Sequence, residues 1–198
     1  MKLLNKIPVL DKGWVALFSS SLQGEDFKHV LKTHYRGLID HRITDMTYIT
    51  LSVKCPLFVQ LTFPEHNLSY SIDRSNLTSE AYIPAVNEIR AASLETSESI
   101  QQDIEQTTEA LLINPKAYQE DGCDLFIAQV VSPISIYNTL LITGSLTSWI
   151  RYISQRGLPS AIEQYRSAIE GCLASEWHNV ILSMRDVDSG KAKKKEKV

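Results

Sequence analysis

Residues 143–156 read TGSLTSWIRYISQR, and this stretch decides how the surrounding chain is expected to fold. It joins a predicted strand of alternating apolar residues, 134–142, to a helix through a small polar turn. The apolar residues of the helix share one stripe: Leu146, Trp149, Ile150 and Ile153. Two arginines, Arg151 and Arg156, follow on the same segment. Because the first turn of a helix presents unpaired N–H groups and arginine pairs well with phosphate, the junction predicts a phosphate-binding site.

Further elements flank this junction. Residues 46–54 alternate between polar and apolar side chains, which predicts a strand with one buried face, and residues 57–63 could form a short helix. Residues 93–112 carry apolar side chains at helical spacing, and Pro115 is expected to stop that helix. A long helix is predicted from Ser160 onward. Strands and helices without regular alternation predict a single α+β domain, with a mixed or antiparallel sheet packed by long helices.

Charge is unevenly distributed along the 198 residues. The net charge is −3, but residues 191–198 (KAKKKEKV) contain five lysines and one glutamate. Residues 1–190 therefore carry 15 basic and 22 acidic side chains. A domain this acidic is not expected to bind nucleic acid in a general way. We expect a folded domain over residues 1–190 and a flexible lysine-rich tail over residues 191–198.

The cysteines and the hydropathy give further limits. Cys55, Cys123 and Cys172 have neither metal-ligand spacing nor the pattern of a disulfide framework. They predict free thiols in a reducing compartment and no metal site. No run approaches the length of a transmembrane helix, so we expect a cytoplasmic protein without membrane partners.

Several separated stretches resemble the flavin-dependent thymidylate synthase family, in the order in which that family has them. They are residues 9–15 (VLDKGWV), 41–59 (HRITDMTYITLSVKCPLFV), 82–84 (YIP) and 128–156, which begins AQVVSP. Together they span most of residues 9–170. The resemblance implies the fold of the thymidylate synthase-complementing proteins.

The resemblance also implies an activity. Members of this family methylate dUMP at C5 to give dTMP, and they use FAD with methylenetetrahydrofolate and NADPH as co-substrates. They are typically homotetramers whose sites lie between subunits. A related pyrimidine nucleotide could replace dUMP as the substrate here.

The family signature is altered in this chain. It consists of Arg-His-Arg, seven further residues and a serine, whereas residues 64–75 read PEHNLSYSIDRS. Glu65 replaces the first arginine, His66 keeps the histidine and Asn67 replaces the second arginine. A carboxylate about 4 Å from an anionic nucleotide costs roughly 4 kcal/mol at an effective dielectric constant of about 20. A further arginine of the family corresponds to Gln129.

The resemblance assigns roles position by position. The motif serine corresponds to Ser75 or Ser71, which are the catalytic candidates. Cofactor contacts are implied for His41, His66, Asn67, Ser145, Thr147 and Arg151, and substrate contacts for Arg156, Gln129 and Arg74.

Three functions remain open from the sequence. The first is an active enzyme that modifies a uracil nucleotide at C5. The second is a relative that binds flavin or nucleotide but has lost catalysis. The third is a structural subunit that forms a hetero-oligomer with an intact relative and uses that relative's motif.

Overall fold

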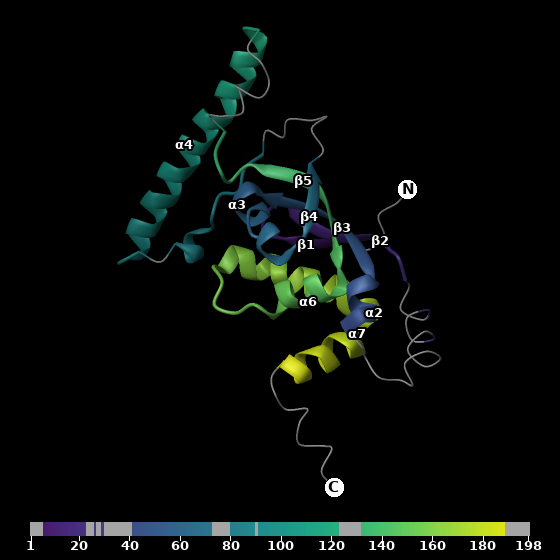
Figure 1. Cartoon of the computed structure of the whole chain (residues 1–198). Helices are drawn as coiled ribbons and strands as arrows, with labels where there is room; N and C mark the ends of the chain where they lie inside the picture. Colours follow the sequence, from purple (N-terminus) through teal and green to yellow (C-terminus); the bar gives the residue numbers. More distant parts are fainter. Residues whose placement is uncertain are drawn as a thin grey trace.

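Five strands form one sheet in the order β1-β2-β3-β5-β4. Figure 1 shows the computed structural model, which describes residues 6–22, 26, 29, 41–72, 80–89, 91–122 and 132–188. The strands are β1 (Ile7–Val9), β2 (Gly13–Ser20), β3 (Tyr48–Pro56), β4 (Ser69–Ile72) and β5 (Tyr137–Ser145). All pairings between these strands are antiparallel. The predicted α+β class is therefore confirmed, with an antiparallel sheet.

Helices connect and cover the strands. The longer ones are α4 (Leu94–Glu120), α6 (Leu146–Ser154) and α7 (Ser160–Asp188). The shorter ones are α2 (His41–Met46), α3 (Leu57–Gln60), η1 (Pro64–His66) and η2 (Val86–Glu88). Figure 1 shows α6 and α7 together against the sheet, while α4 stands apart from them and contacts η2. None of the helices that the structure describes combines the length and hydropathy needed to span a bilayer.

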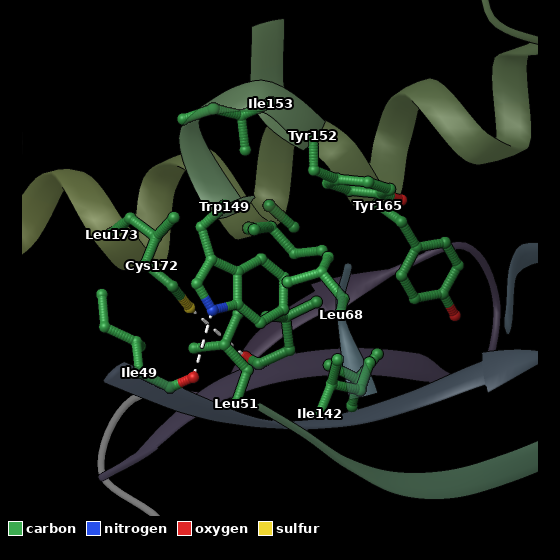
Figure 2. Close-up of a cluster of buried hydrophobic side chains, with 14 of the residues drawn as sticks. Ile49, Leu51, Leu68, Ile142, Trp149, Tyr152, Ile153, Tyr165, Cys172 and Leu173 are labelled. Carbon is green, nitrogen blue, oxygen red and sulfur yellow. Dashed lines mark hydrogen bonds between the residues drawn. The ribbon is translucent and has the colours of Figure 1, made fainter. Parts of the chain in front are cut away.

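The core lies between the sheet and the layer of α6 and α7. Alternate residues of β3, Ile49, Leu51 and Val53, are completely buried, as the period-two pattern predicts. Trp149 of α6 fills the centre of this space, and its Nε1 donates a hydrogen bond to the Ile49 carbonyl at 3.1 Å (Figure 2). The other core residues of α6 and α7 include Leu146, Ile153, Tyr165, Ile169, Cys172 and Leu173. The predicted buried stripe of α6 is confirmed.

The prediction that Pro115 stops a helix is wrong. Helix α4 runs through Pro115 to Glu120. A proline removes one intrahelical hydrogen bond and disturbs one carbonyl, at a cost of about 3 kcal/mol, but residues beyond it can still form their own bonds. The Asp121 N–H donates to the Ala117 carbonyl at 3.0 Å, so the helical pattern resumes after the proline.

The prediction that a strand begins near Ile134 is also wrong. The Ile136 N–H donates to the Pro133 carbonyl at 3.0 Å, which makes a turn, and β5 begins only at Tyr137. Ile134 is 66% exposed. The expected boundary between domain and tail, at residue 190, lies outside the described residues.

Candidate functional site

The segment that corresponds to the family signature is a short turn between α3 and β4. Pro64 begins η1, where its fixed φ suits a helical start and its missing N–H leaves no donor unpaired. Asn67 ends the turn with a left-handed φ of 58°, and its N–H donates to the Pro64 carbonyl at 3.1 Å. Asparagine tolerates this conformation better than most residues. The buried side chains of Phe63 and Leu68 anchor the turn at both ends.

His66 packs on α6 through its ring. The imidazole meets the Tyr152 ring at a centroid distance of 5.5 Å and an interplanar angle of 77°, an edge-on contact. Its Nε2 is buried and has no hydrogen-bond partner. The next residues on either side, Glu65 and Asn67, are exposed. The turn therefore presents a held imidazole with a carboxylate and an amide beside it.

The start of α6 is already occupied by groups of the chain itself. Ser145 caps the helix, with its Oγ accepting from the Ser148 N–H at 3.2 Å. The Leu146 N–H donates to the Thr47 carbonyl at 2.7 Å. Thr147 is only 6% exposed, and its hydroxyl donates to Thr44 Oγ1 at 2.8 Å. Residues near α2 thus satisfy the first turn of α6.

This occupancy bears on the implied FAD. Ser145 and Thr147 are two of the positions at which the resemblance implies cofactor contacts, yet the hydroxyls of both are engaged within the protein. These two hydroxyls therefore already have partners within the chain, and the contacts with FAD that the resemblance implies stay predictions. The junction also fails to bring the helix start and Arg156 together. Helix α6 has nine residues, so at a rise of 1.5 Å per residue it is about 14 Å long, and Arg156 lies beyond its end.

The two arginines lie toward the other end of α6. Arg151 and Arg156 are both exposed, and Arg156 Nη1 donates a long hydrogen bond, 3.5 Å, to the neighbouring Gln155 carbonyl. This is the part of α6 from which Tyr152 meets the η1 turn. The second half of α6 and the residues after it therefore carry both the exposed arginines and the tyrosine that contacts His66.

Sequence reasoning missed the role of Arg166, which is 6% exposed. Its Nη1 donates to the Ile153 carbonyl at 2.7 Å and to Glu170 at 2.9 Å, and its Nη2 donates to Glu163 at 2.6 Å. The guanidinium thereby satisfies a carbonyl in the last turn of α6. The signal was present, because acids three residues before and four after an arginine can pair with it on a helix.

The pKa values of Arg166 and Glu163 shift in the directions expected for an ion pair. Hydrogen bonding to Arg166 is the main cause that lowers the pKa of Glu163, and the charge of Arg156 contributes further. The bond to Glu163 raises the pKa of Arg166. Glu163 therefore links the buried arginine to the exposed Arg156.

The remaining candidate residues are spread over the chain. His41 is the first residue of α2, and its side chain is outside the described set. Ser71 lies on β4, exposed and paired in register with Leu141. Three further candidates, Arg74, Ser75 and Gln129, lie outside the described residues. The assignments of catalytic, cofactor and substrate contacts stay predictions.

A hollow of about 480 Å³ lies elsewhere, beside the start of α7. Its lining includes the carboxylates of Asp11 and Glu88 and contains no lysine or arginine. These carboxylates accept hydrogen bonds from the hydroxyls of Tyr137, at 2.5 Å, and Tyr82, at 2.7 Å. Burial, followed by these hydrogen bonds, raises the pKa of both tyrosines above the usual range. An uncompensated acidic lining disfavours a phosphate, so this hollow is not the candidate nucleotide site.

The described residues form no cluster of side chains that could bind a metal ion. Groups of three or more His, Cys, Asp or Glu side chains that could hold an ion are absent from that part of the chain. Cys55 and Cys172 are free and buried, and burial raises the pKa of Cys172 to about 11. Cys123 lies outside the described residues.

Comparisons with known proteins identify solved structures that share this architecture. No protein-family model matches the sequence, and no curated protein matches it. Among solved structures, the chain is similar to the UMP/dUMP methylase PolB from Streptomyces cacaoi bound with 5-Br dUMP. That match has a TM-score of 0.68 and 15% identity, and covers 86% of this chain and 93% of that one. The complex of PolB with 5-Br UMP gives a TM-score of 0.69 and 17% identity, with 86% and 92% covered. The likeness shows that 86% of this chain shares the fold of PolB.

Proposed function

We propose that the protein binds a pyrimidine nucleoside 5′-monophosphate of the UMP or dUMP class and methylates its uracil ring at C5. The observation that carries this proposal is the match in fold to PolB, a UMP/dUMP methylase solved with brominated forms of both nucleotides. It covers more than nine-tenths of that protein, so the shared part is a whole architecture and not one motif. The sequence resemblance to flavin-dependent thymidylate synthases supports the same chemistry independently.

The nucleotide site is proposed at the end of α6, where it meets η1. Arg156 is exposed there and offers a guanidinium for the phosphate, which it can bind through two parallel hydrogen bonds. His66 lies on Tyr152 at the same junction. Glu65 is exposed, so water screens its charge, and its repulsion of a phosphate about 4 Å away falls toward 1 kcal/mol. The altered signature therefore weakens nucleotide binding without abolishing it.

FAD enters the proposal as a reagent that the sequence resemblance implies. Reduced FAD, methylenetetrahydrofolate and NADPH are the reagents of the resembling family, and a homotetramer is its assembly. The Ser145 and Thr147 hydroxyls are engaged within the chain, so other groups of the protein would have to hold the flavin, which would supply the reducing equivalents. The residues of this chain would bind and orient the nucleotide, and C5 would exchange its hydrogen for a methyl group.

Release of tritium from C5 tests this function. Transfer of the methylene group of methylenetetrahydrofolate forms a C5–C bond, breaks the C5–H bond and releases the C5 hydrogen to water as a proton. Two electrons and a proton from reduced FAD would then convert the methylene group to methyl. The purified protein is incubated with dUMP or UMP tritiated at C5, together with methylenetetrahydrofolate and reduced FAD, and a parallel sample omits the folate. Folate-dependent release supports the proposal, whereas a folded protein that binds neither nucleotide overturns it.

A binding protein without catalysis is the second candidate. Two observations favour it: Glu65 stands where the family has arginine, and the hydroxyls at the start of α6 are turned inward. Nucleotide binding without tritium release would select this candidate. If this chain has no activity alone but raises tritium release above that of a related intact enzyme measured alone, the chain acts as a subunit of a hetero-oligomer.

A further inference from the structure

Ring packing, and not hydrogen bonding, holds the imidazole of His66. In the part of the chain that the structure describes, its side chain makes neither an ion pair nor a hydrogen bond, and Nε2 is buried without a partner. The edge-on contact with Tyr152 is its one described ring contact. A buried polar atom without a partner is costly, so an interaction that keeps the ring in this place must offset that cost.

Tyr152 is itself fixed in the core. It is completely buried, and its ring packs against Phe63 at 5.2 Å and Trp149 at 6.3 Å. Trp149 is in turn bonded to the Ile49 carbonyl on β3. Figure 2 shows Trp149 and Tyr152 extending from α6 into the core that faces the sheet. The surface on which His66 rests is therefore continuous with the rigid centre of the domain.

We propose that Tyr152 is a positioning residue, whose ring sets the orientation of His66 at the nucleotide site. This inference rests on the proposed function for the ligand, but the position of His66 can be measured without one. Phe63 directly precedes η1 and packs on the same ring, so Tyr152 holds both the turn and the imidazole. Loss of the ring would release His66 while leaving the backbone anchor at Leu68 in place.

The ring carries this role and the hydroxyl does not. The hydroxyl of Tyr152 lies 3.5 Å from Thr62 Oγ1, at the limit for a hydrogen bond. Burial raises the pKa of Tyr152 to about 12, so the phenol stays neutral under ordinary conditions. Tyr152→Phe therefore preserves the positioning contact, whereas Tyr152→Leu removes it.

Nuclear magnetic resonance of the histidine side chains tests the inference. The chain has five histidines, and a His66→Gln variant assigns the His66 signals. Carbon-13 relaxation of the His66 imidazole reports how rigidly the ring is held, independently of the ring current that Tyr152 itself produces. We expect an ordered imidazole in the wild type and in Tyr152→Phe, and a mobile imidazole in Tyr152→Leu. Binding of dUMP and UMP, measured by calorimetry, should weaken roughly two- to tenfold in Tyr152→Leu and less than about twofold in Tyr152→Phe.

A matched core variant separates positioning from stability. Leu173→Ala removes a fully buried side chain from α7 and should lower the melting temperature without making the His66 imidazole mobile or changing nucleotide affinity. An equally ordered His66 imidazole in folded Tyr152→Leu would overturn the inference, as would a mobile imidazole with unchanged affinity in a protein that binds nucleotide. If the wild-type protein binds neither nucleotide, the proposed function fails, and the mobility of the His66 imidazole alone still decides whether Tyr152 positions the ring.

Discussion

The side chain of Leu68 lies so close to Gly144 that a Cβ atom added to this glycine would come within 2.3 Å of Leu68 Cδ2. Leu68 directly follows the η1 turn, and Gly144 is the last residue but one of β5. The contact therefore fastens the turn that carries His66 to the strand that leads into α6. Ser148 Cβ, in the first helical turn, lies 3.6 Å from the same point, so little space remains for adjustment.

Gly144→Ala is expected to destabilise the protein. Leu68 is only 2% exposed, so its side chain cannot turn away without disturbing the core. Overpacking of this kind costs about 1–3 kcal/mol in the free energy of unfolding, which urea denaturation measures. Gly171→Ala is the matched control. Gly171 lies within α7, and a Cβ added there would have Ile7 Cδ1 of β1 as its nearest neighbour, at 3.4 Å. This control should be neutral or stabilising by about 0.5–1 kcal/mol, and equal losses in both variants would refute the packing argument.

Arg166→Gln should cost more than the loss of a surface ion pair. The substitution leaves the Ile153 carbonyl and two carboxylates, Glu163 and Glu170, without their buried donor. The loss of one partner from a fully buried pair costs about 3–5 kcal/mol, and partial exposure of the two glutamates reduces the expectation to about 2–3 kcal/mol. Urea denaturation of Arg166→Gln and of the exposed control Arg151→Gln checks this. A difference below about 0.5 kcal/mol between the two variants would show that Arg166 is not structurally important.

Acid should remove the contribution of Glu163. Its pKa is lowered in the folded state, chiefly by Arg166, so the stabilisation is present above the ordinary glutamate pKa of about 4.3. It is lost as pH falls through the lower folded value, because the unfolded chain then binds the proton more tightly. Melting temperatures between about pH 3 and pH 6 should fall less steeply toward acid in Glu163→Gln than in the wild type. Parallel curves for the two proteins would contradict this assignment.

Substitution of Arg156, just after α6, and of Glu65, in η1, should alter nucleotide affinity in opposite directions. Arg156→Ala should weaken dUMP binding by about 1.5–3 kcal/mol, the scale of a charge-assisted hydrogen bond, whereas Glu65→Arg should strengthen it. Lys12→Ala is a control for the loss of one exposed positive charge, since Lys12 lies in the β1–β2 turn and contacts Asp11 at 4.0 Å. Calorimetric titration measures all three. If Arg156→Ala and Lys12→Ala bind dUMP equally well, Arg156 is not part of the site.

The sequence predicts local elements well where one periodicity dominates. The stripe of α6 and the alternation of β3 are read directly from residues such as Trp149 and Leu51, because burial on one face forces that spacing. The predicted end of α4 was wrong because a proline lowers helix stability without always preventing the helix from continuing. Helix α4 continues through Pro115.

The candidate site was harder to predict because its determinants are distant in sequence. The N–H and hydroxyl groups at the start of α6 bind Thr44 and Thr47, about a hundred residues away, and no local pattern shows this. The contact of His66 with Tyr152 likewise depends on tertiary packing. The sequence therefore indicated which residues could serve a nucleotide site, but it did not show that the hydroxyls at the start of α6 are engaged within the protein.

Calorimetric titration of the wild-type protein with dUMP and with UMP, with AMP as the control ligand, is the decisive test of the proposed site. We expect saturable binding of the two uracil nucleotides and at least about tenfold weaker binding of AMP, which corresponds to about 1.4 kcal/mol. A folded protein that binds none of the three, or binds AMP as tightly as dUMP, would contradict a pyrimidine nucleotide site at the end of α6.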